Sequence, residues 1–174
     1  MLSNETKKRL LQMALTCLRP PGEMRPIFSP TTPTGKELAE IKEGLKTGNI
    51  DEGLLARFFP MAYEGITKNG FMEYYFTGHN RLIRGLPRYT KFGLVEWCTA
   101  HPARIIKSIR GKYEVELIGG RKIMTDSELY PGITAYNRLK EGDFVIVHRD
   151  KINMKISEKE HGRICGLYKK GTRA

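Results

Sequence analysis

The chain has 174 residues, of which 40% are hydrophobic and 28% charged, and its formal net charge is +11. This length is enough to bury a core and fits one large domain or two small ones. No apolar run approaches the length of about 18 residues that a membrane helix needs, and the basic N-terminal segment lacks a small-residue cleavage site. We therefore expect a cytoplasmic protein. The three cysteines, Cys17, Cys98 and Cys165, include no C-x-x-C pair, which argues against a disulfide framework and a four-ligand zinc site.

The basic excess leans toward the C-terminal part of the chain. Residues 1–96 carry 14 Lys and Arg against 10 Asp and Glu, whereas residues 97–174 carry 16 against 9. A nucleic-acid-binding face clusters basic residues with aromatic side chains, but here the basic residues are scattered among acidic ones. A solvated surface is therefore the first interpretation, and a nucleic-acid face is the alternative.

The N-terminal part is predicted to be a helical domain over residues 1–93. Helices are expected over residues 4–18, from Thr34 to about Lys46, from Asp51 to Ile66 with a break at Pro60, and from Gly70 to about Arg84. Thr34 and Glu37 have the spacing of a capping box, and Asp51 can cap the third helix. Five of the nine prolines fall within residues 19–33, which predicts an extended loop.

His79 falls in the last of these helices, four residues after Tyr75 and on the same side. Two interpretations are open. His79 is either a hydrogen-bonded core or interface histidine, or a member of a metal or cofactor cluster at the mouth of the domain that follows.

Beyond residue 93 the hydrophobic period changes from that of a helix to that of a strand. Strands are expected over residues 104–109, 113–117, 121–125, 144–148 and 152–156. Gly119-Gly120 is a hairpin signal, and Ser157 with Glu160 has the spacing of a capping box for a short C-terminal helix to about Tyr168. Short antiparallel strands of this kind close into a small OB- or SH3-like barrel. The expected fold class is α+β, with the barrel domain over residues 94–174.

The usual enzyme motifs are absent from the sequence. It contains no Ser-His-Asp ordering, Gly-rich phosphate loop or H-E-x-x-H helix, and we expect a protein that is not an enzyme. A Cys-His dyad that uses Cys98 stays open in principle. A thiolate and an imidazole, here Cys98 and His148, also suit Fe(II) when further ligands come from elsewhere.

Two segments of the C-terminal part resemble a known family. The first reads Cys98-Thr99-Ala100-His101-Pro102-Ala103-Arg104-Ile105, and the second reads Gly142-Asp143-Phe144-Val145-Ile146-Val147-His148. Between them lie a hairpin with Gly119-Gly120-Arg121 and a closing Asp-Ser-x-Leu at residues 126–129. In this order, over residues 97–159, they resemble the HypC/HupF hydrogenase-maturation chaperones. The N-terminal helices resemble no family.

The resemblance implies a small β-barrel chaperone that is not itself a catalyst. Members of the family carry or hand over an iron centre with cyanide and carbon monoxide ligands. They work with a maturation scaffold protein and with the immature large subunit of nickel-iron hydrogenase. By this resemblance Cys98 would be the thiol that contacts iron or a partner, and His148 would be the second functional side chain.

Three further positions follow from the same resemblance. Pro102 would shape the turn behind the cysteine, and Gly142 and Asp143 belong to the second motif. His101 stands where the family usually has an apolar residue, so it is either an extra ligand or an exposed ring, and the exposed ring is the preferred interpretation.

Two functions of different classes are therefore expected. In the first, the barrel is a module for metallocofactor assembly or transport, and the helical part docks a partner. In the second, the basic barrel binds nucleic acid or acts as a protein-interaction module.

Overall fold

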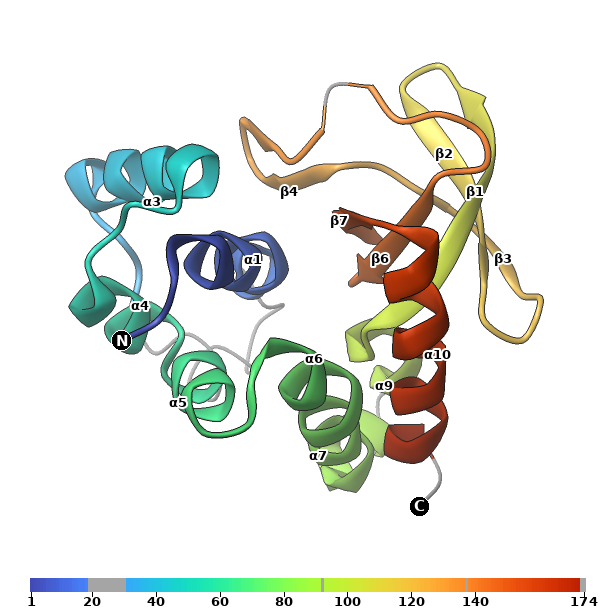
Figure 1. Cartoon of the computed structure of the whole chain (residues 1–174), viewed down its shortest axis with the longest axis horizontal. Helices are drawn as coiled ribbons and strands as arrows, with labels where there is room; N and C mark the ends of the chain where they lie inside the picture. The colour runs from blue at the N-terminus through green and yellow to red at the C-terminus, as the bar shows by residue number, and fades with distance from the viewer. Residues whose placement is uncertain (19–30, 92, 137, 173–174) are drawn as a thin grey trace. The chain divides into compact units, whose positions relative to one another are not determined.

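The computed structural model describes residues 1–18, 31–91, 93–136 and 138–172 (Figure 1). Helices form its N-terminal part, and a five-stranded sheet, a two-stranded sheet and a C-terminal helix follow. The predicted α+β class is therefore confirmed. Most of the Pro-rich segment 19–33 lies outside the described residues.

The chain contacts divide into two compact units. Unit 1 comprises Met1–Phe71 with Tyr130–Ile133, and unit 2 comprises Met72–Leu129 with Thr134–Ala174. The sequence pattern places a boundary near residue 93, whereas this division groups the helices of residues 72–98 with the sheet.

Unit 1 is built from short helices, and the side chains of Ser3, Thr34 and Asp51 cap three of those that the structure describes. They are α1 (Asn4–Ala14) with the 3₁₀ extension η1 (Leu15–Cys17), α3 (Gly35–Thr47), α4 (Glu52–Phe58) and α5 (Pro60–Asn69). Thr34 and Glu37 satisfy each other's backbone N–H groups in the predicted capping box. The Asp51 carboxylate accepts from the Leu54 N–H, and Pro60 begins α5. The core of this unit includes the fully buried α1 side chains Leu10, Leu11 and Met13.

The helical part of unit 2 contains a π-helical segment. α6 (Phe71–Glu73), at the division between the units, leads into the π-helix η3 (Tyr74–His79) and then into α7 (Asn80–Gly85). Two short helices follow, α8 (Pro87–Lys91) and α9 (Val95–Cys98). The helix predicted from Gly70 to about Arg84 is thus present with a change of winding. The helices α8 and α9 lie beyond the last helix expected from the sequence.

The sheet of unit 2 has the strand order β3-β2-β1-β6-β7. Its strands are β1 (His101–Ile109), β2 (Lys112–Leu117), β3 (Lys122–Thr125), β6 (Phe144–His148) and β7 (Lys151–Ile156), and β4 (Glu128–Tyr130) with β5 (Ile133–Thr134) forms the two-stranded sheet. The four neighbouring pairs of the large sheet are antiparallel. One face is covered by a core that includes Ile105, Tyr113, Val115, Val145 and Ile152.

The two edges of this sheet come together at one point. A parallel bridge joins Asp126, just after β3, to Lys151 at the start of β7. The Ile152 N–H donates to the Asp126 carbonyl at 2.6 Å, and the Lys151 ammonium lies 2.9 Å from both Asp126 carboxylate oxygens. The sheet is therefore bent into the partly closed barrel that the strand pattern predicts.

The C-terminal helix α10 (Glu158–Thr172) covers part of the barrel (Figure 1). Ser157 and Glu160 form the predicted capping box at its start. The helix packs against η3, α7, β1 and β6. At its last turn Gly171 approaches the backbone of Phe76 and Thr77 so closely that a Cβ atom there would collide with it. α10 thus joins the π-helix to the sheet.

Candidate functional site

The two segments that carry the family resemblance lie side by side in unit 2. Strands β1 and β6 are antiparallel neighbours, with His101 opposite Val147. Just before β1, the Trp97 carbonyl accepts a hydrogen bond from the Arg149 N–H at 3.0 Å. The backbones that carry Cys98 and His148 therefore run next to each other at one end of the sheet.

Cys98 is the last residue of α9 and is only 4% exposed. Its N–H donates to the Leu94 carbonyl at 2.9 Å. The guanidinium of Arg149 lies 4.2 Å from the centre of the neighbouring Trp97 ring. The thiol is thus covered by protein in this conformation.

Asn80 fixes the backbone between Cys98 and β1. Its side-chain oxygen accepts from the Ala100 N–H at 2.9 Å, and its side-chain nitrogen donates to the Ala100 carbonyl at 3.1 Å. Both residues are fully buried. The Asn80 amide therefore pairs with the Ala100 backbone as a neighbouring strand would. No pattern in the sequence predicted this role.

His148 ends β6 and contacts His79. The two rings meet edge to face with centroids 5.3 Å apart, and His148 and His79 are 1% and 4% exposed. The His148 N–H donates to the Asn153 side-chain oxygen at 3.0 Å. Asn153 lies where the register of β6 and β7 shifts, so a bulge in β7 places this buried amide against His148.

The π-helix carries His79 into an aromatic cluster. The rings of Tyr75 and Tyr74 lie 5.5 and 6.1 Å from the His79 ring. Burial lowers the pKa of His79 to about 4, and a hydrogen bond from the His79 ring to the Asn80 side-chain oxygen offsets this shift only in part. His79 is thus a buried, hydrogen-bonded histidine that is neutral at pH 7, and its ring contacts that of His148.

His101 is buried, and the expectation of an exposed ring is wrong. One ring nitrogen, Nε2, lies 2.8 Å from the Glu96 carbonyl oxygen, and the other, Nδ1, lies 3.0 Å from the Tyr168 hydroxyl. Because a carbonyl can only accept, these partners assign the proton to Nε2 and let Nδ1 accept from Tyr168. Burial lowers the pKa of His101 despite its contact with Glu96. Both nitrogens are engaged, which leaves neither available to a metal in this arrangement.

The other motif residues, Pro102, Gly142 and Asp143, contribute to the strands and turns of the sheet. Pro102 lies inside β1, opposite Ile146, rather than in a turn. Gly142 has a φ of 87° and donates to the Ile105 carbonyl at 2.8 Å. The Asp143 carboxylate accepts from the Lys140 N–H at 2.9 Å and pairs with Lys155 at 2.8 Å. Partial burial opposes ionisation of Asp143, but these partners outweigh it and lower its pKa.

A second thiol and imidazole meet on α10, where we did not expect them. Cys165 Sγ lies 3.7 and 3.8 Å from the two ring nitrogens of His161, which packs on Phe144. His161 and Cys165 are four residues apart in the helix that begins after Ser157, so they lie on the same side of it. The sequence alone could have predicted that they meet. Burial raises the pKa of Cys165 and lowers that of His161, so the pair is uncharged at neutral pH.

The described part of the chain contains no group of three or more His, Cys, Asp or Glu side chains able to hold a metal ion. His79, His148 and His101 are arranged by buried contacts instead.

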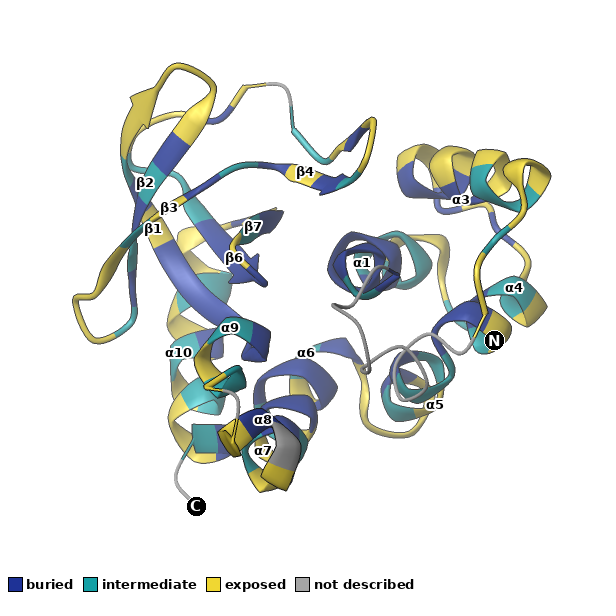
Figure 2. Ribbon diagram, turned by 180° about the vertical axis from the view of Figure 1, so that it is seen from behind, coloured by how far each residue is buried: buried dark blue, intermediate teal, exposed yellow. Residues whose placement is uncertain are grey.

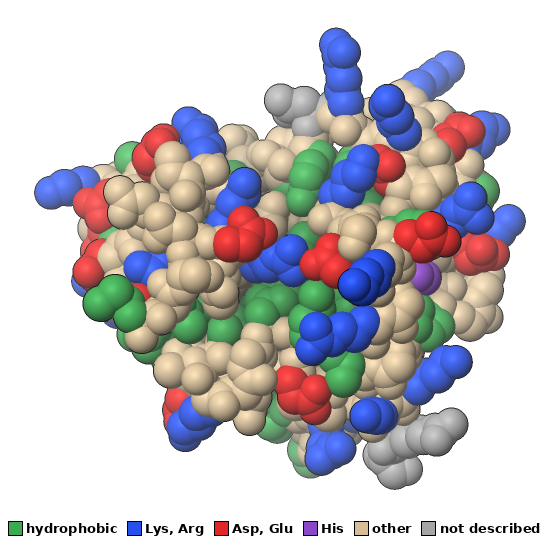
Figure 3. All heavy atoms as spheres, viewed as in Figure 1, with side chains coloured by type: hydrophobic (Ala, Val, Ile, Leu, Met, Phe, Trp, Pro, Cys, Tyr) green, Lys and Arg blue, Asp and Glu red, His purple; other side chains and the backbone are tan. Residues whose placement is uncertain are grey.

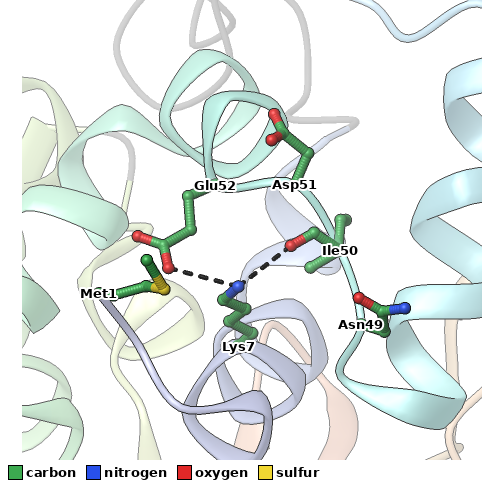
Figure 4. Close-up of a pocket in the computed structure, with 6 residues that line it drawn as sticks. All are labelled: Met1, Lys7, Asn49, Ile50, Asp51 and Glu52. Carbon is green, nitrogen blue, oxygen red and sulfur yellow. Dashed lines mark hydrogen bonds and ion pairs between the residues drawn. The ribbon is translucent and has the colours of Figure 1, made fainter.

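Unit 1 has a hollow beside the start of α1 (Figure 4). At its centre the Lys7 ammonium lies 3.2 Å from the Ile50 carbonyl and 3.3 Å from the Glu52 carboxylate. The Tyr63 hydroxyl and the Leu2 N–H also donate to Glu52. The charge of Lys7 is balanced within the unit, so the hollow does not attract an anion. The lining residues are Met1, Lys7, Asn49, Ile50, Asp51 and Glu52.

Comparison of the chain with protein-family models, with curated proteins and with solved structures gave no match. Among the residues that the structure describes, no helix is long and apolar enough to cross a membrane.

Proposed function

We propose that this chain is a non-catalytic assembly module of the hydrogenase-maturation type, which acts in the cytoplasm by binding partner proteins. One observation supports this proposal above all. The two segments that resemble the maturation chaperones are neighbours at the same end of a small barrel, joined by the pairing of His101 with Val147 and by the bond between Trp97 and Arg149.

Iron with cyanide and carbonyl ligands is a cargo in this proposal. The described residues offer fewer than three suitable side chains in one place, so the remaining ligands come from the partner: a scaffold protein or an immature hydrogenase large subunit. Cys98 is the proposed contact with the cargo or the partner, because a thiolate is the stronger ligand for a soft site. Since Cys98 is 4% exposed, partner binding has to uncover it.

The test is anaerobic purification of the full chain from cells that make a nickel-iron hydrogenase. Infrared spectra of the purified protein are then recorded in the cyanide and carbonyl region. We expect the bands and the co-purified partner to be lost in Cys98→Ala, which keeps a small buried side chain in place. Cys165→Ala is the matched control, because its thiol lies on α10.

Unchanged bands and an unchanged partner in Cys98→Ala would refute the role of Cys98. Absence of both signals in the unaltered protein would refute the proposed function. Circular dichroism of each variant separates loss of folding from loss of binding.

A further inference from the structure

The outer face of β1, β2 and β3 in unit 2 carries exposed residues on each strand, with half-buried glutamates along β2 (Figure 2). The cross-strand register places side chains on this face in rows: Lys107 is opposite Glu114, which is opposite Met124, and Ile109 is opposite Lys112. Val115 and Ile105, which alternate with them, point into the core. We call this surface the hairpin face, and its members include Lys107, Ile109, Lys112, Glu114, Glu116, Lys122 and Met124.

Two large apolar side chains stand in solvent on the hairpin face. Met124 is 47% exposed and Ile109 is 39% exposed, and among the described residues Met1 is the other exposed large hydrophobic side chain. Adjacent strands are about 4.8 Å apart, so Met124 on β3 and Ile109 on β1 are separated by roughly 10 Å or more. One extended partner segment can span this separation and contact both side chains.

Three lysines share the hairpin face with the apolar pair. Lys107, Lys112 and Lys122 are exposed on the same face. Unit 2 carries 20 Lys and Arg against 11 Asp and Glu, a net charge of +9, whereas the rest of the chain carries 10 against 8. Lys and Arg side chains stand out from the end of the sheet where the β1–β2 hairpin lies (Figure 3). The field of this unit therefore favours an acidic partner.

The composition of the face favours a protein over a nucleic acid. Glu114 lies between Lys107 and Met124, and Glu116 lies opposite Lys122, so carboxylates interrupt the cations, and the face is not the continuous basic surface that a phosphate backbone requires. Tyr113, the aromatic residue of β2, is 6% exposed and packs in the core, so it offers no platform for bases. Exposed Met and Ile side chains instead suit the apolar side chains of a protein partner.

We propose that the hairpin face docks an acidic segment of a partner protein that carries apolar side chains. Carboxylates of the segment pair with Lys107, Lys112 and Lys122, and two apolar side chains contact Met124 and Ile109. The surface is independent of Cys98 and His148.

The test uses the full chain and a fluorescent acidic peptide with two leucines separated by three residues, a spacing of about 13 Å when extended. Two comparison ligands are the same peptide with serine in place of leucine and a duplex DNA of about 20 base pairs. We expect the triple variant Lys107→Gln, Lys112→Gln and Lys122→Gln to weaken peptide binding about tenfold at low salt. Ile109→Ser with Met124→Ser should weaken it several-fold, to the level of the serine peptide.

The matched control is Lys159→Gln, Arg163→Gln and Lys170→Gln, which removes the same charge from exposed positions of α10 in the same unit. Peptide binding should be unchanged in this control. The proposal is overturned if the leucine peptide does not bind, if both triple variants weaken it equally, or if the apolar substitutions have no effect. Tighter binding of the duplex DNA than of the peptide would instead assign the face to nucleic acid.

Discussion

At the scale of single residues, buried polar side chains hold the end of the sheet where Cys98 and His148 lie. Asn80 pairs with Ala100, Asn153 accepts from the His148 N–H, and His101 bridges Glu96 and Tyr168. A buried polar group that loses its partner costs more than the hydrogen bond contributed. These side chains therefore specify one arrangement of the two motif segments.

Asn80→Ala should destabilise the protein by about 3 kcal/mol, because it leaves the buried N–H and carbonyl of Ala100 without their partner. The measurement is urea unfolding followed by circular dichroism. Asn69→Ala is the control, since the Asn69 amide bonds only to the Gly65 carbonyl at an exposed site. Equal small effects of both substitutions would show that the Asn80 pair contributes little.

The stability of the protein should fall as the pH is lowered from 6.5 toward 4. Burial lowers the pKa of His79 from 6.5 to about 4. In this window the unfolded chain binds a proton at His79 that the folded chain does not. The free energy of unfolding is therefore at its full value above pH 6.5 and falls as the pH drops below 6.5. At about pH 4.5 we expect His79 to account for a loss of about 2–3 kcal/mol in the free energy of unfolding.

Burial also lowers the pKa values of His101 and His161, so these residues destabilise the protein at low pH in the same way. The variant His79→Leu is therefore needed to isolate the contribution of His79. Urea midpoints at about pH 7 and pH 4.5 should differ less in the variant than in the unaltered protein. An identical pH dependence in both would contradict a depressed pKa for His79.

At the scale of elements, α10 is the helix that ties the π-helix η3 to β1 and β6. Its glycines divide into two kinds. A Cβ atom on Gly171 would collide with the Phe76 carbonyl and lie 2.9 Å from Thr77 Cα, whereas a Cβ atom on Gly166 would meet nothing within 4 Å. Gly171 therefore permits close packing, and Gly166 is an ordinary exposed helix position.

Gly171→Ala should destabilise the protein by about 2 kcal/mol, because the helix has to move away from the π-helix. Gly166→Ala should instead stabilise it by about 0.5–1 kcal/mol through helix propensity. Thermal unfolding of the two variants provides the measurement. Stabilisation by both substitutions would mean that α10 does not pack this closely.

At the scale of the whole molecule, the two compact units each have their own buried residues. In unit 1 Gly44 lies against Ile50, where a Cβ atom would be 2.8 Å from the Ile50 Cβ. Gly44→Ala should therefore loosen unit 1. We expect faster amide hydrogen exchange in α1 and α3 and unchanged exchange in β1 and β6, as for separately cooperative parts.

Hydrogen-exchange mass spectrometry of Gly44→Ala decides this question. Gly35→Ala is the control, since a Cβ atom there would meet nothing within 4 Å. Faster exchange in the strands as well would show that the two units open together.

Local interactions made much of the fold predictable. The capping boxes of Thr34 with Glu37 and of Ser157 with Glu160 join residues three positions apart, and the alternation of Tyr113, Val115 and Leu117 records which face of β2 is buried. The two motif segments, residues 98–105 and 142–148, lie at the neighbouring strands β1 and β6.

By itself the sequence determined the α+β class, the caps, the hairpin at Gly119-Gly120 and the strand order in the chain, because these depend on neighbours in sequence. Only the tertiary structure decided that Asn80 pairs with Ala100, that His101 is buried between Glu96 and Tyr168, and that His79 meets His148. Such contacts join residues that are distant in sequence, and a single polar residue carries no periodic signal of the partner it will find. The burial that selects those partners exists only after the chain has folded.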